Sequence, residues 1–229
     1  NYLSAQYGLN AWSDPYYWYM YKYSMAVSAI PELAYNVYRI IKAVYGKNKK
    51  VIVTDLDNTL WGGVLAEDGP EEIQIGRDTS VGQMYTDIQA YLCEQKELGV
   101  ILAINSKNDE RNVTIGLQKK ESVLSAKDFS SIKANWNPKS QNMREIALDL
   151  KLGSDSFVFL DDNPGEREEV RLYDSKIGIP ELSKPEYYIQ EIDRAGYFEC
   201  IGISNEDRMR GKMYAEAELR GKNQHHYSN

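Results

Sequence analysis

Residues 51–63, VIVTDLDNTLWGG, constrain this chain more than any other stretch. Val51–Val53 are β-branched and a polar break follows at Thr54, which predicts a short buried strand. Two carboxylates, Asp55 and Asp57, come directly after it. Ligands of open α/β sheets bind at the carboxyl ends of the strands. Residues two apart in extended chain point the same way, so both carboxylates can face one site.

Two like charges held close together are unfavourable unless a cation or a shared proton relieves them. A hard cation with oxygen ligands, most simply Mg²⁺, would relieve Asp55 and Asp57. A plain acidic turn or a Ca²⁺ loop would fit the same two residues. A Mg²⁺ site is favoured over these two alternatives if a phosphate-binding hydroxyl, a lysine and a second acidic pair follow at other strand ends or helix starts.

The hydroxyl and the lysine are both present. Residues 100–104 predict a second strand that ends in Asn105-Ser106-Lys107-Asn108, where Ser106 can present its hydroxyl and backbone N–H groups to a phosphate. The alternative for Ser106 is a plain helix cap. Pro138 favours a helix start, which places Lys139 in the first turn of a helix to about Leu150. The helix dipole disfavours a cation there, so we expect Lys139 to reach a cluster of anions.

The second acidic pair, Asp161 and Asp162, follows a third predicted strand at residues 156–160 and precedes another helix. Strands that alternate with helices predict an α/β fold, a mostly parallel sheet flanked by helices. Parallel strands bring their carboxyl ends to one edge. The four groups of polar residues are therefore expected to meet there.

This set of residues has the parts that phosphoryl transfer requires. Asp55 would attack phosphorus and form an aspartyl phosphate. Asp57 would protonate the leaving oxygen and then deprotonate the water that cleaves the intermediate. Ser106 and Lys139 would bind the phosphoryl oxygens.

The predicted cofactor is Mg²⁺. Its expected ligands are Asp55, the backbone carbonyl of Asp57 and Asp161, with Asp162 as a further candidate. The bound cation would let an anionic nucleophile approach an anionic phosphate.

The sequence resembles the haloacid-dehalogenase (HAD) superfamily at its four motifs: D55-L-D57-N58-T59, Ser106, Lys139 and D161-D162. Within it, DLDNTLWGGVLAEDG, INSKND, NW-x-x-KS, VFLDDNPGER and ED-x-x-R-x-x-x-Y are similar to the FkbH-like branch. The resemblance implies a Rossmann-like core, Mg²⁺ dependence and an aspartyl-phosphate intermediate. Asp57 favours phosphate chemistry over dehalogenation, because dehalogenases of the superfamily lack this second aspartate. FkbH-like enzymes load glycerate onto a carrier protein and often have a cysteine before the motif-two serine, but this chain has Asn105.

The segments between the motifs predict a site without a large cap. Val64–Leu65 and Ile73–Ile75 flank a turn and predict a β-hairpin flap over the carboxylates. The flap and a helix at 82–98 fill the interval from Asp55 to Ser106. The interval from Ser106 to Lys139 also has no room for a cap domain. The remaining expected elements are a helix at 109–122, a short strand at 123–124, an edge strand at 176–180 and a helix at 185–195.

The first fifty residues are rich in tyrosine and tryptophan. We expect residues 1–49 to be an aromatic arm and a helix that ends near Tyr45, linking to an upstream domain that the family resemblance describes as SGNH-like. Residues 50–200 would be the catalytic domain, and residues 201–229 a polar helical tail. The arm could instead be a carbohydrate or carrier platform. The helix has an apolar stripe expected to face a core: Leu33, Val37, Ile40, Ile41 and Val44.

Composition limits the partners. A formal charge of −7 and a pI of about 5.0 argue against nucleic acid. No apolar run approaches the ~20 residues of a membrane span, and two cysteines fit a reduced, cytoplasmic setting. The family resemblance implies, by analogy alone, a small phosphorylated metabolite or sugar phosphate, free or carrier-tethered, in capsular polysaccharide or secondary-metabolite biosynthesis. The alternatives are glyceryl transfer from 1,3-bisphosphoglycerate and a non-catalytic docking module.

Overall fold

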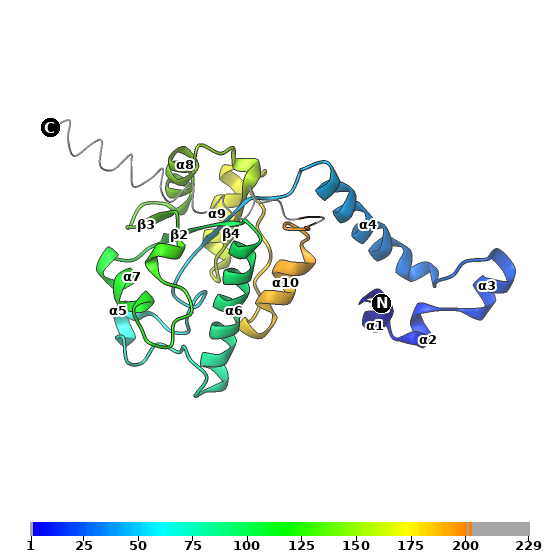
Figure 1. Cartoon of the computed structure of the whole chain (residues 1–229), viewed down its shortest axis with the longest axis horizontal. Helices are drawn as coiled ribbons and strands as arrows, with labels where there is room; N and C mark the ends of the chain where they lie inside the picture. The colour runs from blue at the N-terminus through cyan, green and yellow to red at the C-terminus, as the bar shows by residue number, and fades with distance from the viewer. Residues whose placement is uncertain (1, 201, 203–229) are drawn as a thin grey trace. The chain divides into compact units, whose positions relative to one another are not determined.

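The structure is a computed structural model, and it describes residues 2–200 and 202. The chain divides into two compact units, Asn1–Lys47 and Asn48–Asn229 (Figure 1). The expected helical tail lies outside the described residues, apart from residue 202. This includes four polar residues of the last quoted motif and two histidines to which no role is given: Glu206, Asp207, Arg210, Tyr214, His225 and His226.

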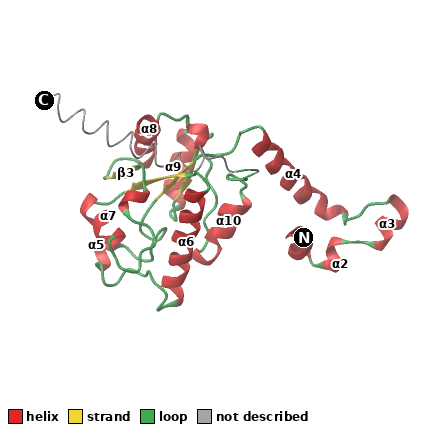
Figure 2. Ribbon diagram, viewed as in Figure 1, coloured by secondary structure: helices red, strands yellow, loops and turns green. Residues whose placement is uncertain are grey.

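A four-stranded, all-parallel sheet forms the centre of the second unit, as the strand–helix alternation predicts (Figure 2). The strand order is β3-β2-β1-β4. Thr54 is level with Ile104 on one neighbour of β1 and with Leu160 on the other, so these strands end together. The strands are β1 (Val51–Thr54), β2 (Ile101–Ser106), β3 (Ser131–Ala134) and β4 (Phe157–Leu160).

Successive strand residues point to opposite sides of the sheet, and in this sheet both sets of side chains are buried. Helices therefore cover both faces. Val51 and Val53 pack with residues of α8 (Lys139–Leu150) and α9 (Pro164–Tyr173). Ile52 belongs to the other hydrophobic cluster, with residues of α6, α7 and α10. Figure 1 shows α8 and α9 together, and α6 and α10 together on the other side. The bounds of this second group are α6 (Ser80–Glu97), α7 (Glu110–Leu117) and α10 (Tyr188–Arg194).

The strand order changes direction at β1. From β1 the chain moves outward through β2 to β3, and then returns to place β4 on the opposite side of β1. Open α/β sheets bind ligands outside the carboxyl ends of the strands at such a switch point. Asp55 follows β1 and Asp161 follows β4, so both lie at this switch point.

The expected β-hairpin flap is wrong. Residues 65–68 form a helical turn, α5 (Leu65–Asp68), and the only pairing in this segment of the described chain is an antiparallel bridge between Gly62 and Gln74. Two backbone N–H groups that would pair with a neighbouring strand donate to side chains instead. Asp68 Oδ2 accepts from Val64 N at 2.7 Å, and Asp57 Oδ1 accepts from Leu65 N at 3.1 Å.

The expected strand at 123–124 is also wrong. The side-chain carbonyl of Gln89 accepts from the backbone N–H groups of Val123 and Leu124 at 2.9 and 3.0 Å, so this segment has no donors left for a neighbouring strand. The strand lies later, at β3. The edge strand expected at 176–180 is reduced to one parallel bridge, between Val158 and Gly178. The described residues also contain four short 3₁₀ helices: η1 (Val27–Ala29), η2 (Ala126–Asp128), η3 (Ser154–Ser156) and η4 (Pro185–Tyr187).

The first unit consists of helices. They are α1 (Tyr2–Tyr7), α2 (Leu9–Trp12), α3 (Pro15–Tyr21) and α4 (Ile30–Val44). The expected core-facing stripe of α4 is not buried: Val37, Ile40 and Val44 are exposed, whereas Arg39 is buried. Within this unit α4 packs mainly against η1 at its own start, which leaves its apolar side uncovered there. In the described part of the chain, no helix combines the length and apolar character that crossing a bilayer requires.

Candidate active site

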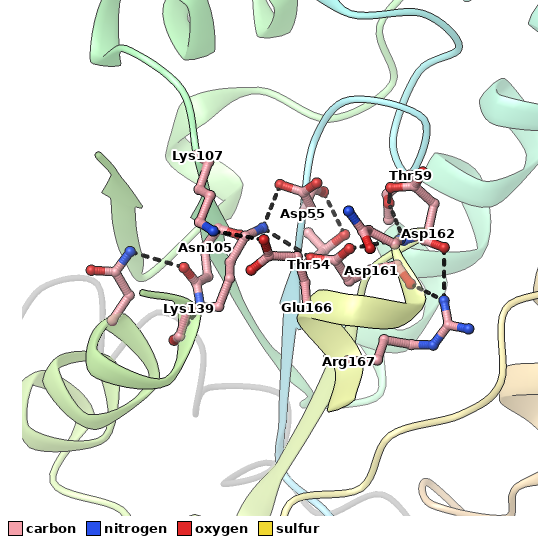
Figure 3. Close-up of polar contacts among 12 residues, drawn as sticks. Thr54, Asp55, Thr59, Asn105, Lys107, Lys139, Asp161, Asp162, Glu166 and Arg167 are labelled. Carbon is pink, nitrogen blue, oxygen red and sulfur yellow. Dashed lines mark hydrogen bonds and ion pairs between the residues drawn. The ribbon is translucent and has the colours of Figure 1, made fainter. Parts of the chain in front are cut away.

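Three carboxylates gather at the switch point. One oxygen from each of Asp55, Asp161 and Asp162 lies within 4.8 Å of the others (Figure 3). The backbone N–H of Asp55 donates to the carbonyl of Leu160 at 2.8 Å, which continues the β1–β4 pairing to the first carboxylate. The sheet therefore positions the cluster directly.

Lys139 joins this cluster from the first residue of α8, as its place after Pro138 predicts. Its ammonium lies 2.8 Å from Asp55 Oδ1 and 2.9 Å from Asp161 Oδ2, and it donates to the carbonyl of Asn105 at 2.7 Å. The residue is 1% exposed. Burial alone would lower the pKa of this ammonium, but Asp55 and Asp161 outweigh burial and hold the pKa above its usual value.

The two carboxylates after β4 resist ionisation. Burial raises the pKa of Asp161 to about 6, although Lys139 acts in the opposite direction. Burial, and then the negative charge of Asp55, raise the pKa of Asp162. Asp162 N donates to the hydroxyl of Thr59 at 3.1 Å, which ties this loop to the loop after β1. The cluster therefore favours a cation that neutralises it.

Asp57 lies apart from the three-carboxylate cluster. Its Oδ1 accepts from Trp61 Nε1 at 2.8 Å and from Leu65 N, and its Oδ2 accepts from Asn108 Nδ2 at 2.9 Å. Burial raises the pKa of Asp57 above its ordinary value, and the hydrogen bonds from Leu65 and Trp61 oppose that rise. The different roles expected of the two motif-one aspartates stay a prediction. Whether the backbone carbonyl of Asp57 binds the metal stays a prediction.

Ser106 is the last residue of β2 and is 2% exposed. The backbone carbonyl of Asn105 accepts a hydrogen bond from the ammonium of Lys139. Ser106 is the next residue in the chain after this contact. Its role in phosphate binding stays a prediction. The following residue, Lys107, forms an ion pair with Glu166 on α9 at 2.6 Å.

Several residues that support the site were not identified from the sequence. Arg167 is 5% exposed, and its Nη1 donates to the carbonyls of Asp161 and Asp162, each at 2.8 Å. The side chain of Asn105 is fully buried and donates to the carbonyl of Lys139 at 2.9 Å. A basic residue in VFLDDNPGER was visible in the sequence. Its bonding to two backbone carbonyls was not, because such contacts leave no pattern of residue types.

The donor set fits a hard divalent cation. Carboxylate oxygens are the ligands that Mg²⁺ prefers, usually with several waters completing its shell. The three carboxylates converge from two neighbouring strand ends, and a single ammonium is their buried counter-charge among the contacts described above. A divalent ion would supply the rest.

The chain is similar to a solved phosphatase domain: the crystal structure of the N-terminal part of the protein BF1531 from Bacteroides fragilis, which contains a phosphatase domain and is complexed with Mg. The two agree with a TM-score of 0.82 and 37% sequence identity over 87% of this chain and 54% of that chain. This chain thus spans about half the length of its relative. No protein-family model and no curated protein matches the sequence. The similarity confirms the Rossmann-like fold and the expected likeness to a HAD-type phosphatase domain.

Proposed function

We propose that this HAD-like domain is a Mg²⁺-dependent phosphohydrolase that acts on a phosphate monoester through an aspartyl phosphate on Asp55. The observation that carries the proposal is the cluster of Asp55, Lys139, Asp161 and Asp162 at the switch point of the sheet. The phosphatase domain with Mg in the similar structure supports both the reaction class and the cation.

Asp55, Asp161 and Asp162 would hold the cation. When bound, Mg²⁺ supplies positive charge that lets an anionic nucleophile approach an anionic phosphoryl group. Lys139 already neutralises part of this cluster, and its positive charge would also attract phosphoryl oxygens bound beside Ser106.

In the first step, a carboxylate oxygen of Asp55 attacks phosphorus, and the bond between phosphorus and the leaving oxygen breaks. Asp57 gives a proton to that oxygen, so the product leaves as an alcohol. In the second step, Asp57 takes a proton from water as the water oxygen attacks phosphorus. The bond from phosphorus to Asp55 then breaks and inorganic phosphate is released.

We further propose a phosphorylated metabolite or sugar phosphate, free or carrier-tethered, as the substrate. The motif intervals leave no room for a cap domain, and an uncovered site suits a large or tethered substrate. The assignment to capsular polysaccharide or secondary-metabolite biosynthesis rests on analogy with the FkbH-like branch. In place of a cap, a domain elsewhere in the same polypeptide, or another protein, would cover the site during the reaction.

Glyceryl transfer is disfavoured because it needs a thiol as acyl acceptor. Asn105 occupies the position where a cysteine is expected, and its side chain is buried in bonds to Lys139 and Asn142. Cys93 lies on α6, where burial raises the pKa of the thiol and so reduces its thiolate fraction. Cys200 belongs to none of the motifs.

The test is phosphate release from a nitrophenyl phosphate and a panel of sugar phosphates, with and without Mg²⁺, beside Asp55→Asn. Release that needs Mg²⁺ and disappears in Asp55→Asn is the expected result. Release that persists in Asp55→Asn would contradict the nucleophile. No release from any substrate would favour acyl transfer or a docking role, and 1,3-bisphosphoglycerate with a carrier protein would then be tried.

A further inference from the structure

The carboxylate of Asp57 is held by three donors from three separate places. Oδ1 accepts from the indole Nε1 of Trp61 at 2.8 Å and from the backbone N–H of Leu65 at 3.1 Å. Oδ2 accepts from Nδ2 of Asn108 at 2.9 Å. A carboxylate has about four lone-pair positions in all. Two donors therefore fill Oδ1 and leave one position on Oδ2.

The two donors on Oδ1 are rigidly placed. Trp61 is 1% exposed, and its ring lies against Gly116, where an added Cβ would come within 2.5 Å of the ring. The other donor is a backbone N–H at the first residue of α5. Both lone-pair positions of Oδ1 thus accept hydrogen bonds from the protein. Oδ2 is the oxygen that can exchange a proton with a substrate.

The orientation of Asn108 is fixed as well. The residue is 2% exposed, and its own Oδ1 accepts from Asp109 N at 3.0 Å and from Asn112 Nδ2 at 2.7 Å. Since two donors face the amide oxygen and a carboxylate faces the amide nitrogen, only one orientation of the amide satisfies all three contacts. The loop after β2 therefore directs an N–H donor at Oδ2 of Asp57.

We propose that Asn108 is a positioning residue for proton transfer by Asp57, holding Oδ2 at the point from which the proton passes to the leaving oxygen. The inference rests on the proposed phosphohydrolase function. In the step concerned, the bond from Asp55 to phosphorus forms, the bond from phosphorus to the leaving oxygen breaks, and the proton on Oδ2 moves to that oxygen. Asn108 takes no part in the bond changes.

The dependence on the leaving group tests this role. A nitrophenolate leaves without a proton, whereas an alkoxide needs one, and kcat/KM reports the steps up to release of the alcohol. We expect Asn108→Ala to lower kcat/KM for an alkyl phosphate by about tenfold or more, a fraction of the full effect of a general acid. The loss for nitrophenyl phosphate should be at most about threefold, which is small on the same scale. Asp57→Asn should show the same selectivity more strongly.

A second variant keeps the test decisive if Asn108→Ala does not fold. Asn112→Ala, at a half-buried position on α7, removes one of the two donors that orient Asn108 and should give a smaller loss of the same selectivity. Thr114→Ala, at an exposed position on the same helix, is the matched control and should leave kcat/KM unchanged for both substrates.

An equal loss for both substrates in the Asn108 and Asn112 variants, or no loss, would overturn the inference. If the wild type is active and Asp57→Asn is selective while the Asn108 and Asn112 variants are not, only the positioning role fails. If the wild type releases phosphate from neither substrate, the proposed function fails and the inference falls with it.

Discussion

Replacing Lys139 by methionine should destabilise the domain, because the ammonium is the buried counter-charge of two carboxylates. It lies 2.8 Å from Asp55 and 2.9 Å from Asp161, and its side chain is 2% exposed. Attraction over such a distance is worth about 6 kcal/mol per pair at an effective dielectric constant of about 20. The desolvation of the ammonium offsets much of that sum.

Removing one partner of a buried ion pair costs about 3–5 kcal/mol, because the other charge stays buried without compensation. A domain of this size loses roughly 2–4 °C of Tm per kcal/mol. We therefore expect Lys139→Met to lower the Tm of the metal-free protein by about 6–20 °C. Mg²⁺ should restore part of the loss, since it would take over the neutralisation of Asp55 and Asp161.

The assay is thermal unfolding followed by circular dichroism, with EDTA and with Mg²⁺. Lys133→Met is the matched control. Lys133 pairs with Glu145 and Asp149 at 3.4 and 2.9 Å but is partly exposed, so its loss should cost at most about 1 kcal/mol. The double variant Lys139→Met/Asp161→Asn should be more stable than Lys139→Met, because one uncompensated charge is gone. A Tm of Lys139→Met as high as that of Lys133→Met would refute the reasoning.

Three further predictions follow from the site. Asp55→Asn should abolish turnover while its circular dichroism spectrum stays that of the wild type; substantial residual turnover would contradict the nucleophile. Because burial raises the pKa of Asp161 to about 6, the native state binds this proton more tightly than the unfolded chain does, so the stability of the metal-free protein should fall as pH rises from about 4 to 6. Mg²⁺ needs the carboxylate form, so its affinity, measured by calorimetry, should rise over the same interval and then level off, and a flat profile would contradict this. Arg167→Met leaves two backbone carbonyls without their donor and should cost about 2–4 kcal/mol in urea unfolding. Arg171→Met, at a half-buried position on the same helix whose side chain is 38% exposed, should cost at most about 1 kcal/mol. Equal losses would contradict the role of Arg167.

The strands that hold the site could be predicted because they are buried on both faces. Every residue of β1, β2 and β4 is buried, and such strands read as continuous apolar runs. β3 was missed because it lies at the edge of the sheet: two of its four residues are half-buried, and one of them, Lys133, is charged. The sequence predicts a strand at 123–124, but the backbone N–H groups of these two residues donate to the side chain of Gln89 instead of to a neighbouring strand.

The charged centre of the site followed from one rule, that parallel strands end together. Asp55, Lys139 and Asp161 meet as that rule predicts. Asn108 and Arg167 could not be found in the same way, because what they do depends on where distant loops come together. The apolar stripe of α4 was predicted from its spacing, but spacing cannot say what covers it, and residues 2–47 leave Val37 and Ile40 exposed.

The measurement that tests the central claim most directly is a search for phosphate on Asp55. A labelled aryl phosphate would be mixed with Asp57→Asn in the presence of Mg²⁺, because this variant should slow hydrolysis of the intermediate. The reaction would be quenched in acid and the peptides mapped by mass spectrometry. The account predicts an acid-stable, hydroxylamine-sensitive phosphate on Asp55 that is absent with EDTA. Steady phosphate release by the wild type, with no labelled protein in either enzyme, would contradict it and indicate direct attack by water.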